Sequence, residues 1–464
     1  MPTSTTVAEL NVLQEAFERN KKSAFKDYYT FLKFQSISSE PVYKEQVLAC
    51  ADWVADYLKP IGFEVEKWQT SGHPTIFANY NLAGPEQPTL LIYNHYDVQP
   101  VDPLELWKTP PFQPTLRNGQ VFARGAQDNK GQCFYVLFAL KTLMELYGKF
   151  PINIKLCIEG EEECGSAGLS GILAQKKSEL KADYLAIVDL DFPKPNKPVV
   201  TLGIRGMVAM DVEITGSRTD LHSGSHGGLA YNPIHALTEL LSKVRDSSGK
   251  ITIPGFYDEV KAVSSEEKKH IRSNFDPDDY FATFGTKATG GEQDFSPLER
   301  NWIRPTFEIN GINGGYSGAG FKTIIPAKAS AKVSCRLVPN QEPQKIGKLV
   351  AEYLESHAPE GTKVKVHVHQ GGGNAVRSNI HSKAVKAFAD AYGEIFQVPC
   401  EYVYSGASIP IIAKLAATSG AEVAMVGLGL PDDGIHAPNE HFGLDRIENG
   451  FLSIARAIQL LKNG

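Results

Sequence analysis

The chain has 464 residues, of which 42% are apolar and 22% charged, a profile typical of folded globular proteins rather than disordered ones. Its formal net charge of −6 argues against a nucleic-acid binder, which needs a basic face. No apolar stretch approaches the length of about 20 residues that crosses a bilayer, so we expect no membrane partner.

The six cysteines and the first residues predict the compartment. The cysteines are spread thinly with no CxxC pair, which predicts buried, reduced thiols rather than disulfides or a metal cluster. Residues 1–22 carry three glutamates and lack the charged-then-apolar layout of a signal peptide. Together these features predict a cytoplasmic protein.

Strands and helices alternate through the first 205 residues. Short apolar runs predict strands at 89–93, 152–158 and 183–188, and longer apolar segments predict helices at 131–147 and 165–176. This order predicts an α/β sheet covered by helices. In such sheets, functional sites gather at the carboxyl ends of the strands.

After residue 205 the pattern changes. Predicted strands at 207–215, 304–309, 327–338 and 363–369 are interspersed with predicted helices at 232–244 and 344–356. The order strand-helix-strand-strand-helix-strand predicts a ferredoxin-like unit inserted into the larger domain, with the glycine run 371–373 as the hinge out. A strand at 422–426 and a helix at 447–462 resume the first pattern. We therefore predict one domain formed by 1–205 and 374–464, and an insertion at 206–373.

Four polar clusters carry the candidate chemistry, at residues 94–97, 124–131, 159–166 and 432–440. Taken singly, each has an ordinary explanation: a His-x-Asp surface pair, an Asp that caps a helix, or a solvated acidic loop. Three adjacent glutamates at the end of a strand repel one another, and a cation would explain them better. The joint occurrence at strand ends therefore favours a metal site.

The residue types in these clusters suit a pair of divalent ions. The clusters offer imidazole and carboxylate ligands, which suit zinc or manganese. They do not resemble a thiolate metal site. One Asp has two oxygens and can bridge ions about 3.5–4 Å apart, the arrangement used for hydrolysis. A Glu beside a ligand Glu is then the natural general base for the water.

Several motifs, modest singly and specific together, carry a family resemblance. They are His95 to Pro100, Arg124-Gly125 before Asp128 to Gly131, Glu162 to Ser166, Gly203 to Gly206, Asp220 to Gly224, Lys322 to Pro326, Arg336 to Pro339 and Asp433 to His436. With them the chain resembles the M20 family of metallopeptidases, within it the carnosinase-like, cytosolic nonspecific dipeptidase group. The resemblance implies a di-metal aminopeptidase-like catalytic domain, with a mixed sheet covered by helices, and an inserted ferredoxin-like α+β domain for dimerisation and as a lid.

The resemblance also implies roles for residues of the metal site. One ion would be held by His95, Asp128 and Asp189, and the second by Asp128, Glu163 and His436, with Asp128 bridging and zinc expected ahead of manganese. Glu162 would be the general base toward a metal-bridging water and then the acid toward the leaving amine. Asp97 would orient His95, and the Asp128–Asn129 peptide bond would be cis.

Substrate contacts follow from the same resemblance. His222 matches the histidine that stabilises the oxyanion from the partner subunit, which implies a homodimer. Arg336 matches the arginine that grips the free carboxylate of a dipeptide, a task that suits a planar guanidinium. Thr323 and Ser408 match further substrate contacts.

Some alternatives stay open at this point. A slip of one residue within Glu161 to Glu163 would exchange the base and the ligand, and Asp191 rivals Asp189. An N-acyl amino acid deacylase of the acetylornithine or succinyl-diaminopimelate type would use the same metal chemistry, and a binding protein could keep the fold without it. We expect four histidines with no family role to lie at the surface: His226, His367, His369 and His441.

Overall fold

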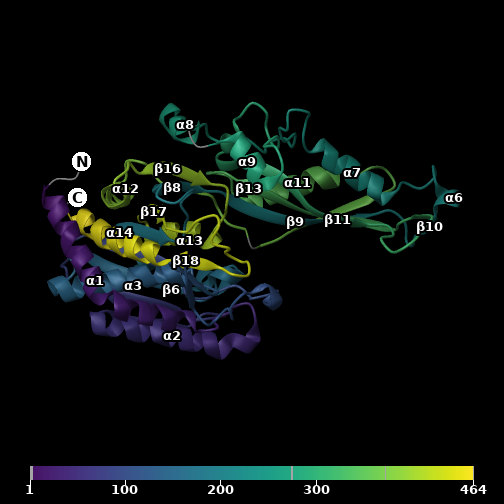
Figure 1. The fold of residues 1–464 in the computed structure, drawn as a ribbon. Coiled ribbons are helices and arrows are strands. Elements are labelled where there is room, and N and C mark those ends of the chain that lie inside the picture. The colour runs from purple at the N-terminus through teal and green to yellow at the C-terminus, as the bar shows by residue number, and fades with distance from the viewer. Residues whose placement is uncertain (1–3, 273–274, 371, 463–464) are drawn as a thin grey trace. The chain divides into compact units, whose positions relative to one another are not determined.

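The computed structural model describes residues 4–272, 275–370 and 372–462 (Figure 1). Gly371 of the predicted hinge lies outside the described residues. The chain divides into two compact units. Unit 1 comprises Met1–Leu202, Ser378–Val403 and Lys414–Gly464, and unit 2 comprises Gly203–Arg377 and Tyr404–Ala413.

A mixed sheet is the centre of unit 1. Its strands lie in the order β1-β2-β6-β3-β7-β17-β8, with the bounds β1 Glu64–Trp68, β2 Thr75–Tyr80, β3 Thr89–His95, β6 Asn153–Glu159, β7 Tyr184–Val188, β8 Val199–Ile204 and β17 Glu422–Val426. The neighbours β6, β3, β7 and β17 run parallel, whereas β1, β2 and β8 are antiparallel to their neighbours. The sheet is therefore parallel where the polar clusters follow its strands.

The helices of unit 1 are α1 Ser4–Leu32, α2 Lys44–Leu58, α3 Lys130–Tyr147, α4 Ala167–Ile172, α5 Lys177–Leu180, α12 Lys383–Phe396 and α14 Leu444–Lys462, and α13 Pro410–Ser419 begins in unit 2 and ends in unit 1. Helices α1, α3 and α14 pack on one another, α12 packs on α14 and β17, and α2 packs on β1 and β2. Helix α3 is buried along most of its length because its sequence is apolar on nearly all sides. The predicted helix at 165–176 is shorter than expected: α4 begins after Ser166, which has a positive φ that the helix cannot include, and it ends at Ile172.

A small three-stranded sheet completes unit 1. Strand β5 (Gln120–Phe122) pairs on one side with β4 (Thr115–Arg117) and on the other with β18 (His441–Gly443). This pairing joins the segment before α3 to the segment before α14, although the two are distant in the sequence.

Unit 2 contains a four-stranded antiparallel sheet in the order β11-β13-β9-β14. The strands are β9 Gly206–Thr215, β11 Thr306–Gly314, β13 Lys328–Leu337 and β14 Lys363–Val368, with the helices α7 Pro233–Lys243 and α11 Pro343–Ser356. Alternate residues of β9 are buried in one core with apolar residues of both helices. Chain order and strand order together are those of the predicted ferredoxin-like unit.

The rest of unit 2 consists of short elements: β10 Leu221–His222, α6 Ser223–His226, α8 Ser265–Arg272, α9 Pro277–Phe284, α10 Pro297–Trp302, β12 Ile324–Ile325 and β15 Val376–Arg377. Strand β16 (Glu401–Ser405) pairs with β8. In the described part of the chain, no helix is long and apolar enough to cross a membrane.

The cysteines follow the sequence prediction only in part. All six are free. Cys50, Cys133, Cys157 and Cys335 are buried as expected, but Cys164 is exposed and Cys400 is partly exposed. Cys164 differs because it lies in the 3-10 turn Glu162–Cys164, on a loop rather than in an element of the core.

Candidate metal centre

Three parallel strands bring their following residues to one edge of the sheet. His95 is the last residue of β3, Asp189 follows β7, and β6 is followed by the 3-10 turn η4 (Glu162–Cys164). Strand β3 pairs with both β6 and β7, so residues far apart in the sequence become neighbours. Asp128 and His436 join them from loops, directly before α3 and before β18.

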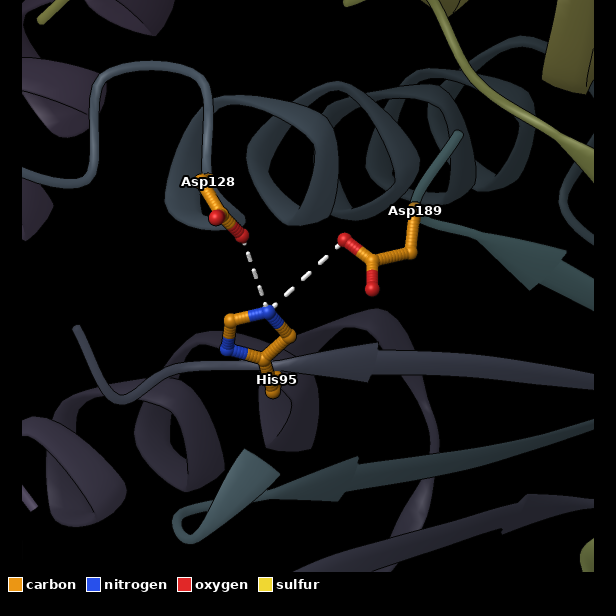
Figure 2. Close-up of side chains that lie close together, drawn as sticks. All are labelled: His95, Asp128 and Asp189. Atoms are coloured by element: carbon orange, nitrogen blue, oxygen red, sulfur yellow. Dashed lines mark hydrogen bonds and ion pairs between the residues drawn. The ribbon is translucent and has the colours of Figure 1, made fainter. Parts of the chain in front are cut away.

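The first group of ligand-type side chains is His95, Asp128 and Asp189. Figure 2 shows the two carboxylates converging on the imidazole of His95. The Nε2 atom of His95 lies 3.2 Å from Oδ1 of Asp128 and 3.7 Å from Oδ1 of Asp189. The His95 side chain is fully buried, so the ligand atoms of this group meet inside the protein.

The second group is Asp128, Glu163 and His436. The Nε2 atom of His436 lies 3.0 Å from Oδ2 of Asp128 and 3.3 Å from Oε2 of Glu163. Asp128 therefore offers one carboxylate oxygen to each group. In each group the ligand atoms lie within 4.8 Å of one another, and the Asp128–Asn129 peptide bond is cis.

The electrostatics of the cluster fit divalent cations. Burial raises the pKa of Glu163 to about 7, and the charge of Asp128 adds to that effect. Burial and the neighbouring carboxylates likewise raise the pKa of Glu162. Hydrogen bonds to Asp128 and Glu163 raise the pKa of His436 to about 10. The carboxylates thus draw positive charge into the site, as protons on the imidazoles or as metal ions.

An unpaired carboxylate oxygen in the cluster also favours a bound cation. Atom Oε1 of Glu163 is buried and has no hydrogen-bond partner among the described residues. An unpaired carboxylate oxygen in a buried site is costly unless a cation takes it. Each group combines one imidazole with two carboxylates, which suits zinc or manganese. The residues present therefore fit a pair of divalent ions.

Asp97 links the end of β3 to the η4 turn that follows β6. Its Oδ1 lies 3.3 Å from Nδ1 of His95. The same carboxylate accepts the backbone N–H groups of Glu162 at 3.2 Å and Glu163 at 3.1 Å, and the hydroxyl of Ser38 at 2.6 Å. The backbone carbonyl of Asp97 also lies 3.1 Å from Nδ1 of His95. Asp97 thus holds the imidazole through both its carbonyl and its carboxylate, and holds the η4 turn through the carboxylate.

Amide side chains, to which the sequence reasoning gave no role, support the carboxylates. Gln99 Nε2 donates to Oε2 of Glu163 at 2.7 Å, and Asn129 Nδ2 donates to Oδ1 of Asp189 at 2.5 Å. Asn94 Nδ2 in turn donates to Oδ1 of Asn129 at 2.7 Å. The position of Asn94 just before His95 was the only signal for it in the sequence.

The rival residues have other partners. Asp191 Oδ1 accepts a hydrogen bond from Gln127 Nε2 at 2.8 Å, and Glu161 Oε2 accepts one from the Thr70 hydroxyl at 3.2 Å. Neither belongs to a ligand group found among the described residues. The geometry thus brings Asp189 and Glu163, rather than their neighbours, into the two groups.

The predicted substrate residues lie in unit 2. Arg336 Nη1 donates to the Ser408 hydroxyl at 2.9 Å. His222 ends the short strand β10, which pairs with β12 just beyond Thr323, and the Thr323 carbonyl accepts the N–H of Ser223 at 3.0 Å. Two pairs, Arg336 with Ser408 and His222 with Thr323, are thus each close in the fold of this unit.

The four histidines that were expected at the surface follow the prediction with one exception. His226, His367 and His369 are exposed. His441 is half-buried instead: its ring stacks on Phe122 with a centroid distance of 4.7 Å. The pairing of β18 with β5 causes this, because it sets His441 opposite Phe122.

Comparisons with known proteins agree with this geometry. The chain is 32% identical over 474 residues to the Cys-Gly metallodipeptidase of Candida albicans, covering 97% of each chain. It is 30% identical over 426 residues to human beta-Ala-His dipeptidase, covering 88% of this chain and 84% of that protein. Among solved structures, an M20 family metallo-carboxypeptidase from Sulfolobus solfataricus matches with a TM-score of 0.84 and 31% identity, covering 95% of this chain and 99% of that one.

The family model described as peptidase family M20/M25/M40 matches residues 91–460. This range contains every residue of both ligand groups. The chain belongs to peptidase family M20/M25/M40.

Proposed function

We propose that the protein is a metal-dependent dipeptidase that hydrolyses the peptide bond of dipeptides. The observation that carries the proposal is the pair of ligand groups that share Asp128, in a chain whose relatives include a fungal metallodipeptidase and a human dipeptidase. The names of these relatives favour a dipeptidase over an N-acyl amino acid deacylase.

The proposed cofactor is two divalent ions per subunit, zinc ahead of manganese. One would be held by His95, Asp128 and Asp189, the other by Asp128, Glu163 and His436. Such ions supply Lewis acidity and make water a stronger acid. The chemistry of the ligand set supports the assignment, since each ion would have one imidazole and two carboxylates.

Glu162 is the proposed proton carrier. Its raised pKa suits a carboxylate that takes a proton from the attacking water near neutral pH. The water oxygen bonds to the carbonyl carbon, the carbon–nitrogen bond then breaks, and Glu162 delivers the proton to the leaving amine nitrogen. Asp97 holds the Glu162 backbone N–H, so it sets the position from which the proton moves.

Arg336 is the proposed anchor for the free carboxylate of the dipeptide. A guanidinium can bind a carboxylate through two parallel hydrogen bonds. Ser408 holds Nη1 of Arg336 at 2.9 Å and would share the same carboxylate, and Thr323 is a further proposed contact.

His222 is the proposed donor to the oxyanion, acting from the partner subunit of a homodimer. Its Nδ1 accepts the N–H of Gly224 at 3.0 Å, which favours the tautomer with the proton on Nε2. That proton is free to stabilise developing negative charge.

Exposed apolar side chains in unit 2 support a partner subunit. Leu229 is 82% and Phe321 93% exposed, near His222 and Thr323 in the sequence. Strand β11 forms an edge of its sheet and exposes Ile309 and Ile312. An exposed edge strand with apolar residues is a template for association with another chain.

We also propose that the enzyme works in the cytoplasm. The six free cysteines support a reducing compartment.

Metal-stripped protein tests the function directly. Activity toward Ala-Ala, β-Ala-His and N-acetylated amino acids should be absent without metal. It should return with Zn²⁺ or Mn²⁺ for the dipeptides only. Return of activity on the acetylated series alone would establish the deacylase instead.

Co-expression of two inactive variants tests the role of His222. Glu162→Gln and His222→Ala subunits should each be inactive alone. If His222 acts in the partner's site, a mixed dimer contains one intact site, and random pairing restores about a quarter of wild-type activity. Absence of recovery, with mixed dimers demonstrated by differential tags, would place His222 in its own subunit's site or outside catalysis.

A further inference from the structure

Glu440 is a buried carboxylate to which neither the resemblance nor the metal chemistry assigns a role. It lies four residues after His436, directly before β18, and its side chain is fully buried. A buried carboxylate needs several hydrogen bonds or a cation to offset its desolvation. Its partners therefore indicate what it does.

All the side-chain partners of Glu440 lie in the loop that ends at Asp128. Oε2 accepts from Arg124 Nη1 at 2.7 Å and from the N–H of Gly125 at 2.9 Å. Oε1 accepts from the N–H groups of Gln127 at 2.9 Å and Asp128 at 3.0 Å. One carboxylate thus holds three backbone amides and a guanidinium of a single loop.

Arg124 and the residue before Glu440 make further hydrogen bonds within unit 1. Arg124 is 1% exposed, and its Nη2 donates to the carbonyl of Pro100 at 2.9 Å. Asn439, beside Glu440, donates to the carbonyl of Leu106 and accepts the N–H of Lys108, at 2.9 and 2.8 Å. The segment that carries His436 is thereby tied to two loops of unit 1.

Asp128 is the one residue that both ligand groups share. Asp128 contributes a carboxylate oxygen to each group, whereas His436 contributes a ring nitrogen to the second group only. Glu440 accepts the backbone N–H of Asp128 and follows His436 on the same short segment. It therefore fixes the distance between a bridging ligand and a ligand of the second group.

We propose that Glu440 is a positioning residue that presets the metal centre by clamping the Asp128 loop to the His436 segment. The inference rests on the proposed function for its metal site. A carboxylate suits the task because all four donors are N–H groups. The amide of a glutamine would turn an NH₂ toward two of them and leave the buried charge of Arg124 without its partner.

The test is metal affinity, measured with Co²⁺ by absorption spectroscopy and calorimetry on metal-stripped protein. Glu440→Gln should weaken Co²⁺ binding by about 10- to 100-fold, the range for partners that orient metal ligands. Glu440→Asp keeps the charge but cannot reach all four donors at once, so its affinity should lie between those of Glu440→Gln and wild type. With saturating metal, kcat should fall more than KM rises.

Glu394→Gln is the matched control. Glu394 pairs with Arg456 through Oε2 and Nε, at 2.5 Å, between α12 and α14. The Arg456 side chain is 7% exposed and that of Glu394 18%, and neither contacts a ligand loop. Its loss should lower the melting temperature and leave Co²⁺ affinity unchanged. The control therefore distinguishes a loss of stability, caused by removing a buried ion pair, from a loss of metal affinity, caused by misplaced ligands.

Failure of the Glu440 inference and failure of the proposed function give different results. Folded Glu440→Gln protein with wild-type Co²⁺ affinity would overturn the inference and leave the proposed function intact. If Glu440→Gln does not fold, Glu440→Asp decides: it must weaken Co²⁺ binding more than Glu394→Gln does. Wild-type protein that binds two ions but does not cleave dipeptides would instead end the proposed function, without affecting the clamp.

Discussion

The carboxylate of Asp97 lies 3.3 Å from the imidazole Nδ1 of His95 and at the same time accepts two backbone amides of the η4 turn. A candidate metal ligand and the proposed base therefore depend on one buried side chain. The η4 turn cannot shift without breaking charge-assisted hydrogen bonds to this carboxylate, and the imidazole is also held by the backbone carbonyl of Asp97, 3.1 Å from Nδ1.

Asp97→Asn should weaken metal binding by about 10- to 100-fold and lower kcat. The asparagine keeps the shape but replaces one acceptor oxygen with a donor that faces N–H groups. Calorimetric titration of metal-stripped protein measures the first effect and initial rates the second. Ser38→Ala is the control, because it removes only the outer hydrogen bond to Oδ2. It should change both quantities by much less.

Glu162→Gln and Glu163→Gln should separate the base from the ligand. Removing the base should lower turnover by about 10²- to 10⁴-fold with metal content unchanged. Removing the ligand should also lower metal content, because Glu163 belongs to the second group. Metal analysis by mass spectrometry beside activity assays measures both. The reverse pattern would show that the two roles are exchanged.

Arg336→Lys should raise KM for dipeptides and change kcat little. Lysine keeps the charge but loses the planar pair of donors and the hydrogen bond to Ser408. Dipeptide amides, which lack the carboxylate, provide the control substrate. Wild type should discriminate strongly against them and the variant weakly. Equal discrimination by both enzymes would remove Arg336 from carboxylate recognition.

Glu267 gives unit 2 a pH-dependent contribution to stability. Burial raises the pKa of this carboxyl, but hydrogen bonds from Ser264 and the ion pair with Arg377 outweigh burial and lower the pKa to about 2. The ionised form is therefore favoured in the folded state. Its contribution is complete above about pH 4.5, the ordinary value for Glu, and is lost as pH falls through 2.

Glu267→Gln should accordingly lower the free energy of unfolding by about 1–2 kcal/mol at pH 7, an estimate reduced for solvent screening. The difference from wild type should shrink as the pH approaches 2. Denaturant unfolding across this pH range measures both. Glu259→Gln is the control, since its ion pair with Lys345 is exposed and should contribute little. A pH-independent difference for Glu267→Gln would contradict the assignment.

The sequence predicted the sheet edge well because its signals are local. The apolar run that becomes β3 ends at His95, and the run that becomes β7 ends just before Asp189, so polar residues at strand ends indicated the site. The inserted unit was equally visible, because half-buried strands such as β9 alternate buried and less buried residues.

Supporting residues were harder to predict because their partners are distant in the sequence. Glu440 and Arg124 are separated by 316 positions, and no periodicity connects them. Strands β1 and β2 were not predicted either. The prediction that His441 lies at the surface was wrong for the same reason. The pairing of β18 with β5 that half-buries it joins segments distant in the sequence.

The hydrogen bond between His436 and Asp128 joins residues 308 positions apart, which orders events during synthesis. A ribosome has to complete almost the whole polypeptide before the second ligand group can exist, whereas the three side chains of the first group are part of the chain once Asp189 has been added. A premature stop at any codon from 190 to 436 yields a chain that contains the three side chains of the first group and lacks His436 of the second. Assembly of the second group therefore waits for the C-terminal segment that carries His436.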